Sequence, residues 1–168
     1  MTNEQFLSAV LPEAGPYLLA EPKQFTNDEG ELISYFDHKA FESVADLLTA
    51  ATKLAQNNNA YFALGSIHEV RRKKIRKADN ISRVRAFWLD IDIKDSPKHY
   101  PDQRTAASEL KSFVTGAGLP EPCIVDSGGG LHVYWPLTES IDAEQWVHYA
   151  GLLKQATKTR KLKADPAR

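Results

Sequence analysis

The sequence predicts a mixed α/β fold, of the α+β kind, in which helices pack on a largely antiparallel sheet. Short apolar runs of alternating polarity, amphipathic segments with a period near 3.6 residues and breakers between them all indicate it. With 168 residues, 42% hydrophobic and 26% charged, the chain has the size and composition of one globular domain. We therefore expect a single domain spanning residues 1–168.

The chain begins with a helix followed by a strand pair. Residues 3–11 have the pattern of a short amphipathic helix, and Thr2 is a candidate cap for it. Residues 17–20 and 32–36 read as strands because both are apolar and are separated by the turn-forming Asn27-Asp28-Glu29-Gly30.

A longer helix is expected next, over residues 38–56, ending at Asn57-Asn58-Asn59. Its apolar side chains recur at helical spacing: Phe41, Val44, Leu47, Leu48 and Leu54. Residues 60–67 are apolar and strand-like. Residues 69–82 have no apolar period and are expected to form a loop.

The second half alternates strands and helices. Strands are expected over residues 84–93, 122–125 and 131–137, because each is an apolar run between breakers. A helix over 102–117 is expected to stop at Gly118. The last helix, over residues 142–158, places four large side chains on one face: Trp146, Tyr149, Leu152 and Leu153.

The strand over residues 84–93 carries two carboxylates. Successive strand side chains point to opposite faces. One face then holds the apolar residues Phe87, Leu89, Ile91 and Ile93, and the other holds Trp88, Asp90 and Asp92. Two neighbouring carboxylates repel each other and resist burial unless a cation or a set of donors compensates them. Asp90 and Asp92 are therefore candidate ligands of a divalent metal.

A glycine turn followed by a histidine forms the second candidate site, Ser127-Gly128-Gly129-Gly130-Leu131-His132. Consecutive glycines permit a tight reversal and close approach of a ligand to the backbone. The Ser127 hydroxyl, the His132 ring and nearby backbone N–H groups suit phosphate oxygens. The alternative is a plain glycine hairpin in which His132 binds a neighbouring carbonyl group.

Positive charge gathers upstream although the net charge is only −1. The segment between residues 71 and 85 holds a single acid, Asp79, and a run of candidate DNA-binding residues: Arg71, Arg72, Lys73, Lys74, Arg76 and Lys77. Such a run is the footprint expected for phosphate contacts, and a solvated face is the alternative.

Taken together, the Asp-x-Asp strand and the downstream Ser127–His132 motif resemble the archaeo-eukaryotic primase superfamily, in particular the primase-polymerase domains of phage and plasmid replication proteins. The resemblance covers residues 84–137. It implies a catalytic sheet like that of the RNA-recognition-motif fold, preceded by an N-terminal α/β portion. It also implies DNA-directed nucleotidyl transfer with Mg²⁺ or Mn²⁺ as the cofactor.

The resemblance assigns roles to individual residues. Asp90, Asp92 and His132 are implied to be catalytic, with Asp90 and Asp92 holding metal. Nucleoside triphosphate is implied to bind Ser127, His132 and the glycine turn of Gly128, Gly129 and Gly130. The implied partners are a single-stranded DNA template, nucleoside triphosphates and a replicative helicase.

The family's third motif begins with an acid, and Asp165 is the candidate for this further metal ligand; a solvated tail residue is the alternative. The arginine segment that follows this acid in phage and plasmid members has no counterpart before residue 168. We therefore expect the domain to be truncated at its C-terminal end.

Two further functions stay open on the sequence alone. One is a catalytically inactive or incomplete relative that binds nucleotide or single-stranded DNA, and the other is a metal-dependent nuclease using Asp90 and Asp92. The N-terminus does not resemble a signal peptide, and no apolar run approaches the roughly 20 residues that span a bilayer. A cytoplasmic protein of a bacterial cell, with a phage or plasmid origin and no membrane partner, is therefore expected.

Overall fold

The computed structural model describes residues 1–72 and 75–166. These residues form two compact units. The first unit comprises Met1–Arg85 and Glu139–Ala143, and the second comprises Ala86–Thr138 and Glu144–Arg168. The prediction that the chain behaves as one domain stays a prediction.

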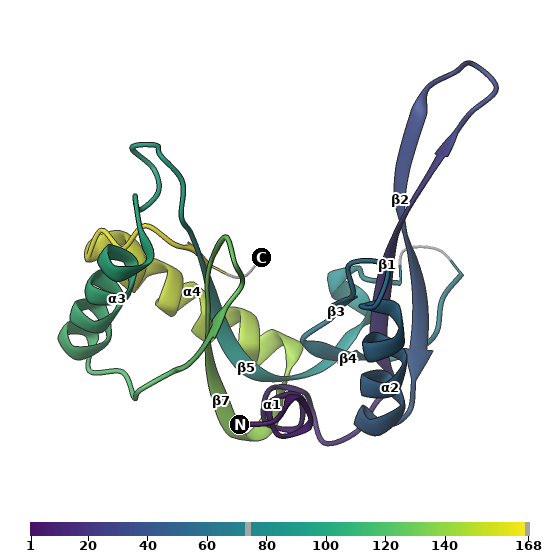
Figure 1. Ribbon diagram of the computed structural model, residues 1–168. Coiled ribbons are helices and arrows are strands. Elements are labelled where there is room, and N and C mark those ends of the chain that lie inside the picture. The colour runs from purple at the N-terminus through teal and green to yellow at the C-terminus, as the bar shows by residue number, and fades with distance from the viewer. Residues whose placement is uncertain (73–74, 167–168) are drawn as a thin grey trace. The chain divides into compact units, whose positions relative to one another are not determined.

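The first unit is built around an antiparallel hairpin. Its elements are α1 (Asn3–Val10), β1 (Tyr17–Thr26), β2 (Leu32–Phe41), α2 (Val44–Leu54), β3 (Tyr61–Phe62), β4 (Gly65–Ile67) and the 3₁₀ helix η1 (Ala78–Asn80). One sheet has the order β2-β1-β3. Figure 1 shows β1 and β2 as a long hairpin that extends past β3. Strand β4 pairs with the beginning of β5 (Ile81–Asp92).

The second unit packs two helices with an antiparallel sheet. Its elements, besides the acidic end of β5, are α3 (Gln103–Ala117), β6 (Cys123–Asp126), β7 (Gly130–Asp142) up to Thr138, α4 (Ala143–Thr159) from Glu144 on, and β8 (Asp165–Pro166). Strand β7 lies between β5 and β6, and β8 pairs with β5. The predicted class, helices on a largely antiparallel sheet, is confirmed.

The predicted cap of the first helix and the predicted stop of α3 are both present. The Thr2 hydroxyl accepts a hydrogen bond from the Gln5 backbone N–H at 3.2 Å, and the Gln5 side chain accepts one from the Thr2 N–H at 2.8 Å. This reciprocal pair is a capping box. In α3, Asp102 caps the first turn and Gly118 ends the helix with φ of 66°.

The prediction of a helix over residues 38–56 was wrong at its beginning. Residues 38–41 belong to β2, and α2 starts only at Val44. The Ser43 hydroxyl accepts a hydrogen bond from the Asp46 N–H at 3.1 Å, which fixes the helix start at this point. Both hairpin strands are longer than predicted. Strand β1 continues to Thr26 through residues that are half-buried or exposed, so no buried face marks its outer half, and β2 continues through residues 38–41, which the sequence pattern assigns to the helix.

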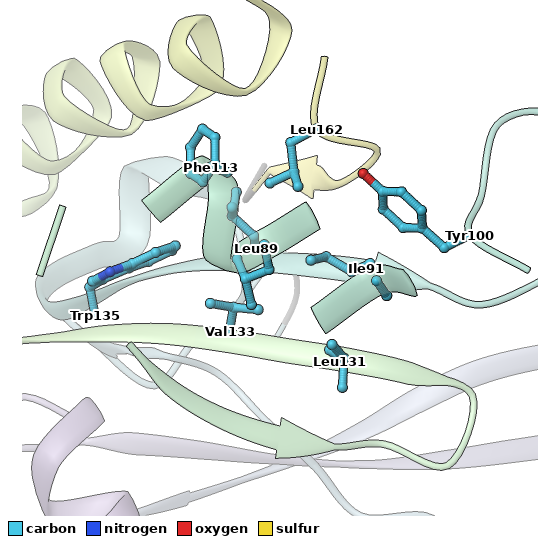
Figure 2. Close-up of a cluster of buried hydrophobic side chains, with 10 residues drawn as sticks. Leu89, Ile91, Tyr100, Phe113, Leu131, Val133, Trp135 and Leu162 are labelled. Carbon is cyan, nitrogen blue, oxygen red and sulfur yellow. The ribbon is translucent and has the colours of Figure 1, made fainter. Parts of the chain in front are cut away.

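The core of the second unit lies between the sheet and the helices. Leu89 and Ile91 of β5 meet Leu131, Val133 and Trp135 of β7, and Phe113 of α3 covers them (Figure 2). Leu89, Ile91 and Val133 are each 1% exposed or less. These are the residues that the alternation of the two strands placed on the apolar face.

A short late segment completes the first unit. Ser140 is buried, its backbone N–H donates to Glu13 Oε1 at 3.0 Å, and the Arg83 Nε–H donates to its hydroxyl at 3.2 Å. A hydrogen bond with the Ser140 side chain is the main reason that the pKa of Glu13 lies below its ordinary value, and the backbone N–H of Ser140 lowers it further.

Candidate nucleotide and metal site

The acidic strand presents Asp90 and Asp92 away from the core. Leu89 and Ile91, between which Asp90 lies, are buried, whereas the Asp90 side chain is 51% exposed and that of Asp92 is 43% exposed. The expected separation of an apolar face from a carboxylate face is confirmed at these positions. A ligand in solvent can therefore reach both carboxylates.

His132 lies beside Asp90. Its Nε2 atom is 3.7 Å from Asp90 Oδ1, and the two side chains come from the neighbouring strands β7 and β5. Gly130 permits this approach, because a Cβ atom at position 130 would lie 2.2 Å from the carbonyl oxygen of Ile91. Two motifs that are far apart in sequence therefore meet at one place.

Asp165 lies near the same carboxylates. Strand β8 pairs with β5 so that the Cα of Asp165 lies opposite that of Asp90, and the Asp165 residue is exposed. Residues directly opposite in an antiparallel pair share a face. The third candidate acid therefore lies on the carboxylate face of the strand.

The glycine turn is held by its own hydrogen bonds. The Ser127 N–H donates to the Gly130 carbonyl at 3.0 Å, and the Gly128 N–H donates to Asp126 Oδ1 at 2.8 Å. Gly128 has φ of 79°, a conformation that glycine adopts at low cost. These two amides have partners, so a bound phosphate would have to displace those bonds or use Ser127 and His132 instead.

Burial and like charge act together on Asp90. The pKa of its carboxyl group is raised, first by burial and then by Asp92 and Asp165, against the lowering effect of His132. Accumulated negative charge at one edge is the condition that a bound cation relieves.

Replacing Asp90 by asparagine is therefore expected to stabilise the metal-free protein at neutral pH. At a pH below the ordinary value of 3.8, the folded and unfolded chains both hold the proton and the substitution changes little. Above the raised folded pKa, the folded state carries a charge that it solvates poorly, and Asp90→Asn removes this cost.

Because the side chain is half exposed, screening limits the gain to well under 1 kcal/mol, or about 1–3 °C in Tm. Thermal unfolding in the presence of a chelator, at neutral and acidic pH, measures it. A gain in Tm that does not shrink as the pH falls contradicts the argument.

Basic residues that the sequence did not single out surround Asp92. Lys94 Nζ lies 2.9 Å from Asp92 Oδ2, and His99 Nε2 lies 3.5 Å from the same oxygen. His99 lies in the loop that follows β5, and a β-bridge between Ile93 and Tyr100 holds this loop next to the end of the strand. Lys163 Nζ also donates a hydrogen bond to the His99 carbonyl at 2.9 Å. Of these two contacts, only that of Lys94 could have been expected from the sequence, because Lys94 lies two residues after Asp92.

The donor set fits a hard divalent cation. Mg²⁺ and Mn²⁺ prefer oxygen ligands, and Asp90 and Asp92 offer carboxylates on one exposed face. Within residues 1–72 and 75–166, no group of three or more His, Cys, Asp or Glu side chains is close enough together to hold a metal ion. Asp90 and Asp92 therefore offer two carboxylates on one face, and Asp165, opposite Asp90, does not complete a set of three within the described part of the chain.

Two aromatic residues near the site serve packing. Tyr134 is 7% exposed, and burial, followed by the charge of Asp90, raises its pKa to about 12. Trp88 stacks on Trp146, with ring centroids 4.9 Å apart.

The basic segment lies in the first unit. Arg71 is bound by Glu69, which precedes the segment, at 2.6 Å and by Asp79 at 2.8 Å, so its charge is compensated by nearby carboxylates. Arg76 lies over the ring of Phe36. Arg72 and Lys77 are exposed, and the predicted contacts of Lys73 and Lys74 lie outside the described residues.

Comparisons with models of protein families, with curated proteins and with solved structures find no match for this chain. Among the helices of the described residues, none is both long and apolar enough to cross a membrane.

Proposed function

We propose that this chain is a primase-polymerase catalytic domain that performs template-directed, metal-dependent nucleotidyl transfer. The observation that supports the proposal most strongly is the meeting of the two motifs, with His132 Nε2 3.7 Å from Asp90 Oδ1. The Asp-x-Asp strand and the Ser127–His132 motif resemble those of primase-polymerases, and a shared site requires them to be neighbours.

In this mechanism the 3′ oxygen of a primer forms a bond to the α-phosphorus of a nucleoside triphosphate. The bond between this phosphorus and the oxygen that bridges the α- and β-phosphates breaks, pyrophosphate leaves, and the hydroxyl proton passes to water. A divalent ion, when bound, stabilises the attacking and leaving oxygens. Asp90 and Asp92 would hold it.

The other residues bind and orient the substrate. The His132 ring can donate a hydrogen bond to a phosphate oxygen, and the exposed Ser127 hydroxyl can donate another. Lys94, beside Asp92, adds a positive charge at the same edge. Such positioned charges and donors are the main means by which proteins accelerate phosphoryl transfer.

A second candidate is a catalytically inactive relative that binds nucleotide or single-stranded DNA. The interactions of Asp92 favour it, because Lys94 and His99 already lie against the oxygen that would bind metal. Nucleotide binding without incorporation would identify this case.

The test is a calorimetric titration of a non-hydrolysable deoxynucleoside triphosphate with Mn²⁺, followed by extension of a primed template. We expect the double variant Asp90→Asn/Asp92→Asn to lose metal-dependent binding and at least about 100-fold in incorporation rate. The matched control is Glu109→Gln/Glu144→Gln, which removes two exposed carboxylates from helices α3 and α4.

Wild-type affinity in the Asp90→Asn/Asp92→Asn variant contradicts the proposed site. Strand cleavage without incorporation contradicts the proposed reaction and indicates a nuclease.

A further inference from the structure

The hairpin of the first unit has two faces of different chemistry. The register pairs Pro22 with Phe36 and Lys23 with Tyr35, so the alternation of both strands can be followed residue by residue. One face, the charged face, carries Glu21, Lys23, Phe25, Ile33, Tyr35, Asp37 and Lys39. The other, the uncharged face, carries Pro22, Gln24, Leu32, Ser34, Phe36 and His38.

The uncharged face exposes aromatic rings. Phe36 is 39% exposed and Tyr61 of β3 is 48% exposed, and their ring centroids lie 5.5 Å apart, edge to face. Tyr61 pairs with Ala20, which pairs with His38, so it lies on this face as well. The pKa of His38 is lowered, mainly by burial and then by Arg76, which favours its neutral form.

A cation lies over these rings. The guanidinium carbon of Arg76 is 5.0 Å from the centroid of the Phe36 ring, and Arg76 is exposed. The backbone next to Arg76 is anchored by Ile75, which is 8% exposed and packs with Leu18 and Ile67. The buried Asn80 side chain donates to the Ile75 carbonyl at 2.8 Å and holds the segment there.

We infer that the uncharged face, with Phe36, Tyr61 and Arg76, binds single-stranded nucleic acid. Exposed aromatic rings with a nearby arginine form the surface on which bases stack while phosphates are neutralised. The hairpin strands place no carboxylate on this face that would repel phosphates. The identification of the ligand as a DNA template rests on the proposed function.

The opposite face serves as an internal comparison. It carries a similar aromatic pair, Phe25 and Tyr35, 51% and 48% exposed, with ring centroids 6.0 Å apart. However, Glu21 and Asp37 share this face, and Lys23 binds Glu21 at 2.9 Å. The two faces therefore expose aromatic rings to a similar extent, but the strands place carboxylates, which repel phosphates, on the charged face alone.

The test compares two double variants that each remove one phenylalanine and one tyrosine. A fluorescent single-stranded DNA of about 15 nucleotides is titrated in chelator, without nucleotide. Phe36→Leu/Tyr61→Leu is expected to weaken binding at least about tenfold. Phe25→Leu/Tyr35→Leu is expected to stay within about twofold of wild type. Equal losses in the two variants, or none in either, overturn the inference.

Arg76→Ala is expected to reduce the slope of log K against log salt by about 0.7, the value for one phosphate contact on a single strand. An unchanged slope contradicts the role of Arg76. Ultraviolet cross-linking of the same DNA to the wild-type chain needs no variant that could misfold. Adducts at Phe36 or Tyr61 support the inference, and adducts confined to Phe25 or Tyr35 overturn it.

The outcome is separable from that of the proposed function. DNA binding that depends on Phe36 and Tyr61, without nucleotide incorporation, supports this surface and contradicts the enzyme. Incorporation that is unaffected by Phe36→Leu/Tyr61→Leu supports the enzyme and contradicts the surface. Loss of self-association, rather than of DNA affinity, in that variant shows that the face binds a second copy and overturns the inference.

Discussion

Replacing Gly130 by alanine is expected to lower the free energy of unfolding of the second unit by about 3 kcal/mol and to disrupt the candidate site. The new Cβ atom would lie 2.2 Å from the Ile91 carbonyl oxygen and 3.2 Å from the Asp92 Cα atom. Both are backbone atoms of β5, so no side-chain rotation relieves the clash. Strands β5 and β7 must separate at the point where Asp90 meets His132.

Gly129→Ala is the matched control, because a Cβ atom at position 129 has no neighbour within 4 Å. Urea unfolding followed by tryptophan fluorescence measures both variants. The three tryptophans, Trp88, Trp135 and Trp146, all belong to the second unit. Similar unfolding midpoints for the two alanine variants would show that the close contact at Gly130 is not important.

Phe113→Ala is expected to cost about 3–5 kcal/mol, since it leaves a cavity in the core that supports the acidic strand. Phe113 is 4% exposed and belongs to the cluster that contains Leu89, Ile91 and Leu162. The same fluorescence-detected unfolding gives the value. Ser112→Ala, at the exposed neighbouring position of α3, is expected to stay within about 0.5 kcal/mol. A cost of Phe113→Ala no larger than that of Ser112→Ala contradicts the packing seen in Figure 2.

Local patterns predicted the second unit well. Alternation identified the buried faces of β5 and β7, because one face of each strand packs on helices and the pattern therefore shows in the sequence. The C-terminal end of α3 was predicted from Gly118, which adopts a positive φ at that point. The contact between Asp90 and His132 depends on β5 and β7 being neighbours in the sheet, and the spacing of the motifs in the sequence does not give the order of the strands.

The first unit was harder to predict because its hairpin exposes apolar side chains on both faces. Phe41 lies three residues before Val44 and fits a helical period, yet it pairs with Tyr17 in the sheet. The Ser43-x-x-Asp46 cap was the better signal for the helix start. The contacts of Arg76 with Phe36 and of His99 with Asp92 join residues across loops, and only tertiary structure reveals them.

The late segment around Ser140 has a consequence for the order in which the protein is made. A nascent chain that ends near Arg85 already contains α1, the hairpin and α2, but it lacks the residue to which Glu13 and Arg83 both bind. Domains generally begin to fold during synthesis, starting from the N-terminus. Here the first unit is completed only after residues 86–138, the larger part of the second unit, have been synthesised. Until then, Glu13 and Arg83 lack their hydrogen bonds with Ser140, which is encoded more than fifty codons downstream of Arg83.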